Sequence, residues 1–141
     1  MKVKFKKLSE NAVTPSYSKP GDAAMDLTAT TKTEEGKNLV YGTGLAIEIP
    51  EGYVGLIFPR SSLTNYDLSL ANHVGVLDSS FRGEVTFKFK RTDLMAFSKE
   101  YDVGNRIGQL LIIPYPKVEL VEVQELSSTE RGSGSYGSSG T

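Results

Sequence analysis

The segment "FPRSSLT" (58–64) ends an apolar run with an arginine and two hydroxyls, a combination that can bind phosphate oxygens. The fork of Arg60 can donate paired hydrogen bonds to an oxyanion. Ser61 and Ser62 add hydroxyls, with backbone N–H groups at the start of a possible helical turn. The same residues could instead form a helix cap beside a solvated arginine, and taken alone they leave both interpretations open.

Two aspartates could supply carboxylate chemistry. Asp78 follows the apolar stretch "HVGVL" (73–77), where partial desolvation would hold it as a general base. Asp26 stands in "GDAAMDLTA" (21–29), beside the start of an apolar strand. Each also has a simpler interpretation, because an aspartate commonly opens a turn by bonding its own backbone.

A further polar pair stands in "VGNRIGQLLIIP" (103–114), where Arg106 and Gln109 head a predicted buried strand. For Arg106 alone, a surface salt bridge is the simpler interpretation.

The segment "RGSGSYGSSG" (131–140) is too rich in glycine and serine to bury a core. Its glycines permit backbone angles that turn successive N–H groups toward an anion. It is not a P-loop, because it lacks the Gly-Lys-Ser/Thr ending and no helical pattern follows. A flexible tail is the simpler interpretation of these residues.

The composition bounds the class of protein. The 141 residues are 38% hydrophobic and 23% charged, which suits one soluble globular domain. A formal net charge of -1 gives no general attraction to nucleic acid or anionic lipid, so an anion site must be built locally. The chain has no cysteine and a single histidine, His73, which excludes disulfides and thiolate or polyhistidine metal sites. No signal peptide or membrane span is visible, so we expect a cytoplasmic location.

The elements between these polar segments are predicted to be strands, because their hydrophobic residues recur with a period of two. "EVTFKFK" (84–90) shows this alternation, and the other candidates are "VKFKKL", "LAIEIP", "YVGLIFP" and "KVELVEV". Many short strands separated by Gly and Pro predict an all-β sandwich or barrel over residues 1–126. "SSLTNYDL" (61–68) could hold one short helix capped by one of its serines. Residues 127–141 differ in composition and form a separate C-terminal segment.

Five segments, in this order and spacing, resemble the five motifs of the trimeric all-β deoxyuridine triphosphatase (dUTPase) family over roughly residues 3–140. They are "GDAAMDL", "PRSSL", "NHVGVLDSSFRGE", "GNRIGQL" and "RGSGSYGSSG". The resemblance implies a jelly-roll-like homotrimer with active sites shared between subunits, in which the C-terminal arm of one chain closes over a site formed by its neighbours. It also implies hydrolysis of dUTP to dUMP and pyrophosphate, with Mg²⁺ as cofactor.

The resemblance also implies a role for each matching residue. Asp78 would activate the water that attacks the α-phosphorus, and Asp26 would hold hydrated Mg²⁺ indirectly, through a metal-bound water. Arg131 would clamp the γ-phosphate. Phe81 would pack under the deoxyribose, and Tyr136 would stack on the uracil. The other implied substrate contacts are Arg60, Ser61, Ser62 and Gln109 on the phosphate chain, Asn72, Gly75, Val76 and Leu77 at the uracil edge, and Gly137 and Ser138 in the arm.

Four positions depart from the family pattern. Phe81 stands where the family usually has Tyr, so ring stacking is retained and the phenol hydrogen bond is lost. Asn105 replaces an aspartate, Ser135 replaces a glycine, and Tyr136 replaces Phe or His.

Two other functions compete with dUTP hydrolysis. The first is a dCTP deaminase, or a bifunctional deaminase–dUTPase, which shares the fold and also has Phe at the position of Phe81. Deaminases carry a general-base glutamate two residues after the matching threonine, and here that position is Lys88. The second is a non-catalytic dUTPase-like binding module. The chain retains the residues that a catalytic site would need, which argues against it: Asp26, Asp78, Arg60 and Arg131.

Overall fold

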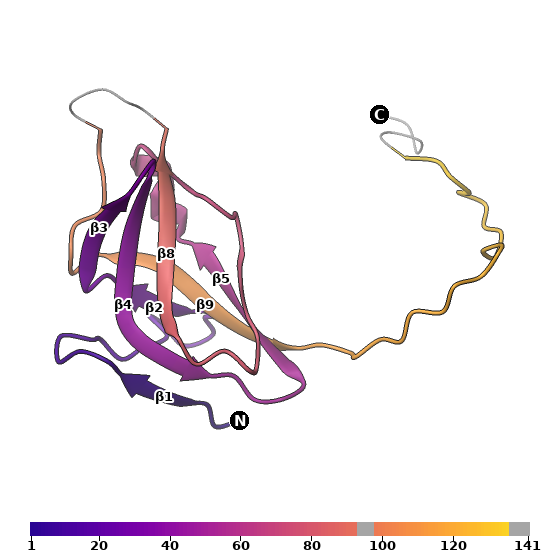
Figure 1. Ribbon diagram of the computed structural model, residues 1–141, viewed down its shortest axis with the longest axis horizontal. Coiled ribbons are helices and arrows are strands. Elements are labelled where there is room, and N and C mark those ends of the chain that lie inside the picture. Colours follow the sequence, from indigo (N-terminus) through magenta and orange to yellow (C-terminus); the bar gives the residue numbers. More distant parts are fainter. Residues whose placement is uncertain (93–97, 136–141) are drawn as a thin grey trace.

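The computed structural model describes residues 1–92 and 98–135, and the regular structure among them consists of strands and a single 3₁₀ turn (Figure 1). In chain order they are β1 (Lys4–Lys7), β2 (Met25–Thr28), β3 (Thr31–Glu35), β4 (Asn38–Glu48), β5 (Tyr53–Pro59), the 3₁₀ turn η1 (Ser61–Asn65), β6 (Leu68–Leu70), β7 (Gly75–Leu77), β8 (Glu84–Arg91) and β9 (Arg106–Pro114). One sheet has the order β1-β4-β8-β6, with β3 paired to β4, and the other has the order β2-β9-β5-β7. The prediction of an all-β fold is therefore confirmed.

The hydrophobic core lies between the two sheets. In β8 the side chains of Val85, Phe87 and Phe89 are buried, while those of the alternating Thr86, Lys88 and Lys90 are exposed. This is the predicted pattern of period two, with one face of the strand toward the core. Burying one such large apolar side chain contributes roughly 1.5–3 kcal/mol to folding.

The sheets approach each other closely at Gly108 in β9. A Cβ atom at this position would lie 2.1 Å from Cε1 of Phe87, so only glycine leaves room for that ring. The register of β2 against β9 also shifts between Leu27 and Thr28. Ile107 and Leu110 are three residues apart and would point to opposite faces of a regular strand, but both are buried here. Gln109, between them, lines a surface cavity.

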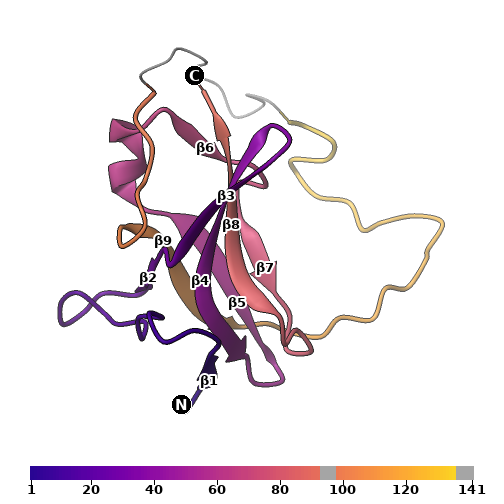
Figure 2. The same ribbon diagram turned by 60° about the vertical axis from the view of Figure 1, so that its left-hand side comes forward.

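Two expectations about local structure were wrong. The 3₁₀ turn η1 is preceded by Arg60 at its N-cap and has no side-chain cap, so neither Ser61 nor Ser62 caps it. "KVELVEV" (117–123) forms no strand in the single chain, where the polypeptide leaves the sandwich after β9 (Figures 1 and 2). The physical reason is that a strand needs a neighbouring edge for its backbone groups. No helical element of the described residues has the length and hydrophobicity of a membrane span.

Candidate active site

Asp26 is the centre of an ion-pair cluster on the second sheet. Its Oδ1 atom accepts a hydrogen bond from Arg60 Nε at 2.9 Å, and its Oδ2 atom accepts one from Arg106 Nη1 at 2.9 Å. The Asp26 side chain is only 10% exposed, whereas Arg60 is 22% and Arg106 is 50% exposed. Arg60 also directs Nη1 toward Ser62 Oγ at 3.4 Å. The buried carboxylate therefore orients an arginine whose remaining donors are free to bind an anion.

Strand register brings Gln109 into the same cluster. In β9, Gln109 pairs with Asp26 of β2 on one side and with Phe58 of β5 on the other. Arg60 follows directly after β5, so it reaches across β9 to Asp26. A cavity of about 520 Å³ opens here, and its lining residues are Ser18, Lys19, Asp22, Ala23, Ala24, Asp26, Arg60, Ser61 and Gln109. Three predicted phosphate contacts, Arg60, Ser61 and Gln109, thus share one surface cavity with Asp26.

The cluster includes residues that the sequence did not assign to the site. Arg106 does form an ion pair, as its simpler interpretation predicted, but its partner is Asp26 inside the site. Arg106 Nη1 also donates to Ser18 Oγ at 3.3 Å. Lys19 and Asp22 line the cavity as well, and Asp22 Oδ2 accepts a hydrogen bond from the Lys19 backbone N–H. An isolated antiparallel β-bridge pairs Ser16 with Asp26 and so holds the segment with Lys19 and Asp22 at the cavity. No sequence motif predicts this bridge.

The side chains around this cavity offer few ligands to a divalent metal ion. No group of three or more histidine, cysteine, aspartate or glutamate residues in the described ranges could hold a metal ion. Both oxygens of Asp26 already accept arginine N–H groups. A Mg²⁺ ion carried on phosphate oxygens fits better, because it retains waters and needs only one or two carboxylates nearby. Asp26 and Asp22 are the carboxylates that line this cavity.

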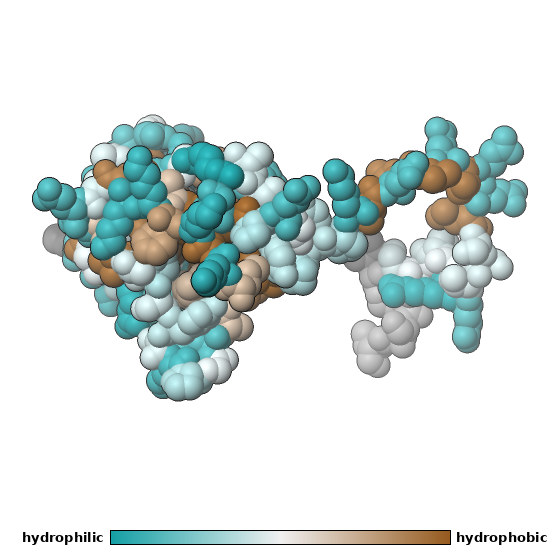
Figure 3. Space-filling model, turned by 90° about the horizontal axis from the view of Figure 1, so that it is seen from below, coloured by the Kyte–Doolittle hydropathy of each residue, from teal (hydrophilic) through white to brown (hydrophobic). Residues whose placement is uncertain are grey.

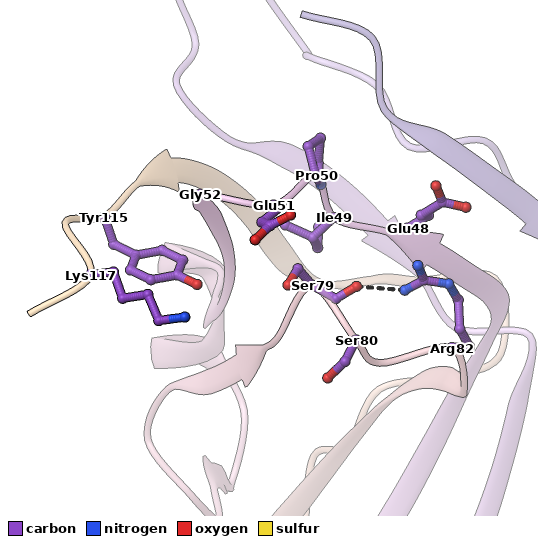
Figure 4. A pocket seen from close by; sticks show the side chains of 10 residues that line it. All are labelled: Glu48, Ile49, Pro50, Glu51, Gly52, Ser79, Ser80, Arg82, Tyr115 and Lys117. Carbon is purple, nitrogen blue, oxygen red and sulfur yellow. Dashed lines mark hydrogen bonds between the residues drawn. The ribbon is translucent and has the colours of Figure 1, made fainter.

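Asp78 lies at a different edge of the sandwich, directly after β7. It was expected to be partly desolvated, but in the single chain it is exposed. The loop that it opens borders a second cavity, of about 500 Å³, against the turn between β4 and β5 (Figure 4). Arg82 closes this loop by donating from Nη1 to the Ser79 backbone oxygen at 2.6 Å. Desolvation of Asp78 would therefore require a further surface to cover it.

The turn before β7 places Asn72 beside the backbone of Gly75. The Val74 N–H donates to the Asn72 carbonyl at 2.6 Å across His73, which has φ of 60°. A Cβ atom built at Gly75 would lie 3.7 Å from Asn72 Nδ2. The side-chain amide and the β7 backbone are therefore neighbours, as a base-recognition role for Asn72 and Gly75 requires.

Phe81 packs over Gly83 in the loop after Asp78. A Cβ atom at Gly83 would lie 2.7 Å from Phe81 Cζ, so the ring rests on bare backbone. The side chain is 40% exposed. Gly83 therefore permits a supported aromatic ring that still offers surface for stacking. Asn105, another departure from the family pattern, accepts a hydrogen bond from the Asp102 N–H at 2.9 Å and so closes a turn.

Within one chain, the predicted general base Asp78 and the predicted phosphate contact Arg60 lie toward opposite ends of β5. Leu77, the neighbour of Asp78, pairs with Gly55 at the far end of β5 from Arg60. The strand from Gly55 to Arg60 spans about 17 Å at roughly 3.3 Å per residue. Arg131 lies in the segment that follows β9, where its Nε donates to the Gly134 carbonyl at 2.9 Å. Tyr136, Gly137 and Ser138 lie outside the described residues.

Comparisons with known proteins identify the family of this chain. A sequence model of the dUTPase family matches residues 10–140. The deoxyuridine 5'-triphosphate nucleotidohydrolase of Nautilia profundicola is 39% identical over 143 residues, covering 99% of each chain. A dUTPase variant from Staphylococcus bacteriophage 80alpha, solved with dUpNHpp, superposes with a TM-score of 0.83 at 32% identity, covering 99% of each chain.

A dUTPase variant from phage phi11 of S. aureus, described with a structural Mg(II) ion, superposes with a TM-score of 0.73 at 27% identity. This comparison covers 89% of the present chain and 98% of the phage chain. The family match spans the sandwich, the Arg60 cavity and the C-terminal segment alike. This chain therefore belongs to the dUTPase family, whose members are dUTP nucleotidohydrolases.

Proposed function

We propose that this enzyme hydrolyses dUTP to dUMP and pyrophosphate at sites shared between the subunits of a homotrimer. The observation that carries the proposal is the cavity in which Arg60, Ser61 and Gln109 surround the ion pair of Asp26. Arginine and hydroxyl donors at one cavity suit a polyphosphate, because phosphoryl transfer depends mainly on alignment and charge neutralisation.

Asp78 acts as the general base in this proposal. Its carboxylate accepts a proton from a water molecule while the water oxygen attacks the α-phosphorus, and pyrophosphate departs. Arg60, Ser61, Ser62 and Gln109 hold the phosphate chain in line for this attack. Asp26 would hold Mg²⁺ indirectly, through a metal-bound water, and the ion would neutralise part of the phosphate charge. Hydrogen-bond donors aimed at developing charge supply much of such a rate enhancement.

The segment around β7 selects the base and the sugar. Asn72 and the backbone of Gly75, Val76 and Leu77 read the uracil edge, and a narrow β-arm crowds out the thymine methyl group. Phe81 packs under the deoxyribose. A ribose 2'-hydroxyl against this ring would be desolvated without a partner, which disfavours UTP.

The separation of Asp78 and Arg60 within one chain supports a shared site. Asp78 follows the strand that pairs with β5 at Gly55, and the strand from Gly55 to Arg60 spans about 17 Å at roughly 3.3 Å per residue, so in this proposal a second copy supplies one of the two. The segment after β9 offers the means of association, because Val118, Leu120, Val121 and Leu126 are largely exposed. Figure 3 shows these hydrophobic side chains on the extended segment, away from the sandwich. They would be covered by packing against a neighbouring subunit.

Residues 127–141 form the arm that closes over a neighbour's site. Arg131 clamps the γ-phosphate, Tyr136 stacks on the uracil, and the backbone N–H groups of Gly137 and Ser138 donate to phosphate oxygens. Ordering such a segment costs about 1 kcal/mol or more per residue. A triphosphate offers enough acceptors to offset this cost, and closure then excludes water from the reacting groups.

Deamination of dCTP is not favoured by the structure. Lys88, at the position where a deaminase has its glutamate, is exposed on the outer face of β8 and forms an ion pair with Glu35. An ammonium group on the solvent side of a strand cannot act as the carboxylate base of that reaction.

The test is pyrophosphate release from dUTP, dTTP, dCTP and UTP, with and without Mg²⁺. We expect rapid release from dUTP with Mg²⁺ and slow release from the other nucleotides. Ammonia release from dCTP would support the deaminase. Nucleotide binding without turnover of any of the four would support a binding module instead.

A further inference from the structure

Lys19 is a cationic residue on the wall of the phosphate cavity, and no predicted role uses it. The cavity of about 520 Å³ is lined by residues from the segment before β2 as well as by Arg60, which follows β5, and by Gln109 of β9. The lining residues from the segment before β2 are Ser18, Lys19, Asp22, Ala23 and Ala24. This segment therefore borders the same space as the predicted phosphate contacts.

A tight turn fixes the backbone of Lys19 at this wall. The Asp22 N–H donates to the Lys19 carbonyl at 3.2 Å, and the Lys19 N–H donates to Asp22 Oδ2 at 2.7 Å. Pro20 and Gly21 occupy the two central positions, and Gly21 has φ of 91°. Proline followed by a glycine with positive φ is typical of a type II turn. Because its two ends are bonded to each other twice, the turn sets where the Lys19 side chain begins before any ligand binds.

The cluster around Asp26 anchors this turn to the sandwich. Arg106 Nη1 donates to Ser18 Oγ at 3.3 Å and to Asp26 Oδ2 at 2.9 Å. The bridge between Ser16 and Asp26 ties the same segment to β2. Lys19 is therefore held beside the carboxylate that orients Arg60.

The positive charge of Lys19 is available to a ligand. Asp26 forms ion pairs with Arg60 and Arg106, so their charges are partly neutralised. Asp22 binds the backbone N–H of Lys19 rather than its ammonium group. Within residues 1–92 and 98–135, no ion pair includes Lys19, which is exposed. Of the two cationic residues that line the cavity, Arg60 thus has a carboxylate partner and Lys19 has none among the described residues.

We propose that Lys19 is a further phosphate-binding residue, whose ammonium group donates to oxygens of the phosphate chain of the nucleotide. An ammonium group has three N–H donors and no acceptor, and it binds phosphate as a point charge. Its flexible four-carbon stem lets the charge follow the phosphate chain while the turn holds the backbone. Arg60 supplies a fixed orientation, and Lys19 supplies charge. This inference rests on the proposed function, because it assigns the cavity to the phosphate chain of dUTP.

The test measures binding of dUpNHpp and of dUMP to Lys19→Gln by isothermal titration calorimetry in the presence of Mg²⁺. Glutamine removes the charge and keeps a polar side chain. We expect the affinity for dUpNHpp to fall by about threefold to tenfold, between the scale of an exposed ion pair and that of a charge-assisted hydrogen bond. The affinity for dUMP, which has a single phosphate, should fall by less than about twofold. The loss for dUpNHpp should shrink as salt is added, because ions screen exposed charges.

Two further variants serve as controls. Lys37→Gln removes the same charge from the turn between β3 and β4, and Lys37 does not line this cavity. We expect it to bind dUpNHpp as the wild type does. Lys19→Arg keeps the charge and should retain most of the affinity. The Tm of Lys19→Gln should match that of the wild type, because an exposed side chain contributes little to stability.

Several outcomes would overturn the proposal. Unchanged affinity of Lys19→Gln for dUpNHpp would mean that Lys19 does not contact the phosphates. Equal losses for dUpNHpp and dUMP would show that the turn acts on the rest of the nucleotide. A loss as large in Lys37→Gln, or in Lys19→Arg, would show that the position or the charge of Lys19 is not the cause. These results leave the proposed function intact as long as the wild type releases pyrophosphate from dUTP, whereas failure of that reaction contradicts the proposed function itself.

Discussion

Arg60 donates to Asp26 at 2.9 Å although the strands β5 and β2 do not pair with each other. Strand β9 lies between them, and the contact passes over Gln109, which is paired with Asp26. The ion pair therefore ties three strands together beside the cavity that Asp26, Arg60 and Gln109 line. Its carboxylate is mostly shielded from solvent, so removing the charge leaves two arginines without their shared partner.

Asp26→Asn tests this arrangement. We expect KM for dUTP to rise and more Mg²⁺ to be needed for half-maximal rate, because Arg60 loses its orientation and the metal-bound water loses a carboxylate. Unfolding free energy should fall by about 1–3 kcal/mol, less than for a fully buried pair. Metal titrations of the rate and urea denaturation check both effects. Arg106→Gln, which removes the more exposed partner, serves as the milder control.

Asp78→Asn should abolish most turnover while leaving the fold intact. The carboxylate is exposed in the single chain, so its loss costs little stability. Removing a general base typically lowers the rate by ~10²–10⁴. Single-turnover kinetics and binding of dUpNHpp would separate chemistry from affinity. Near-normal turnover in Asp78→Asn would show that Asp78 is not the general base. Asp102→Asn is the control, because it changes another exposed aspartate and should behave as wild type.

Phe81→Ala should narrow the preference for dUTP over UTP. The ring rests on Gly83 and offers its open face to the sugar, so its removal makes room for a hydrated 2'-hydroxyl. The ratio of kcat/KM for the two nucleotides measures this effect. Phe81→Tyr retains the ring and should be nearly neutral. An unchanged ratio in Phe81→Ala would place sugar discrimination elsewhere.

Truncation after Glu130 should separate catalysis from stability. The described residues beyond this point, 131–135, contribute no side chain to the core, so Tm and oligomeric state should stay almost unchanged. Turnover should fall by a factor on the order of 10²–10³, the scale of losing preorganised charge stabilisation. Arg131→Ala should reproduce much of the loss. Full activity in the truncated chain would mean that the arm is a linker.

Acid should weaken the anchoring of the loop that carries Tyr101. Burial of Glu100 raises the pKa of its carboxyl, but hydrogen bonds from Arg91 and Lys32 outweigh burial and hold the pKa below the ordinary value of 4.5. Because the folded-state pKa is lowered, the ionised carboxylate stabilises the fold fully above that value. This stabilisation is lost as pH falls through the lowered pKa.

Glu100→Gln checks that prediction. We expect the variant to be less stable than the wild type at neutral pH, since it leaves Arg91 and Lys32 without this partner. The difference in unfolding free energy should shrink as pH falls well below 4.5, where the wild-type carboxylate is also neutral. Urea denaturation across this range measures it. A difference that stays constant with pH would exclude ionisation as its source.

The strands and the polar segments between them could be predicted from residue patterns. The alternation of Val85, Phe87 and Phe89 is a local property, because successive side chains of any strand point to opposite faces. The five motifs are local too, and their order sufficed to indicate the family. The role of Arg106 could not be predicted in this way. Its ion-pair partner, Asp26, is distant in sequence, and no local pattern indicates the pairing.

Only the tertiary structure decided which of these residues meet. Strand order places β9 between β2 and β5, so Asp26, Gln109 and Arg60 share a cavity, and it leaves Asp78 at another edge. In the alternating segment 117–123, the sequence pattern predicted an element that does not form in the single chain. Its pattern predicts a strand, but a strand forms only where another edge satisfies its backbone, and within one chain the segment finds none. Pairing is a property of the partner's position in space, which the spacing of residues along one chain does not encode.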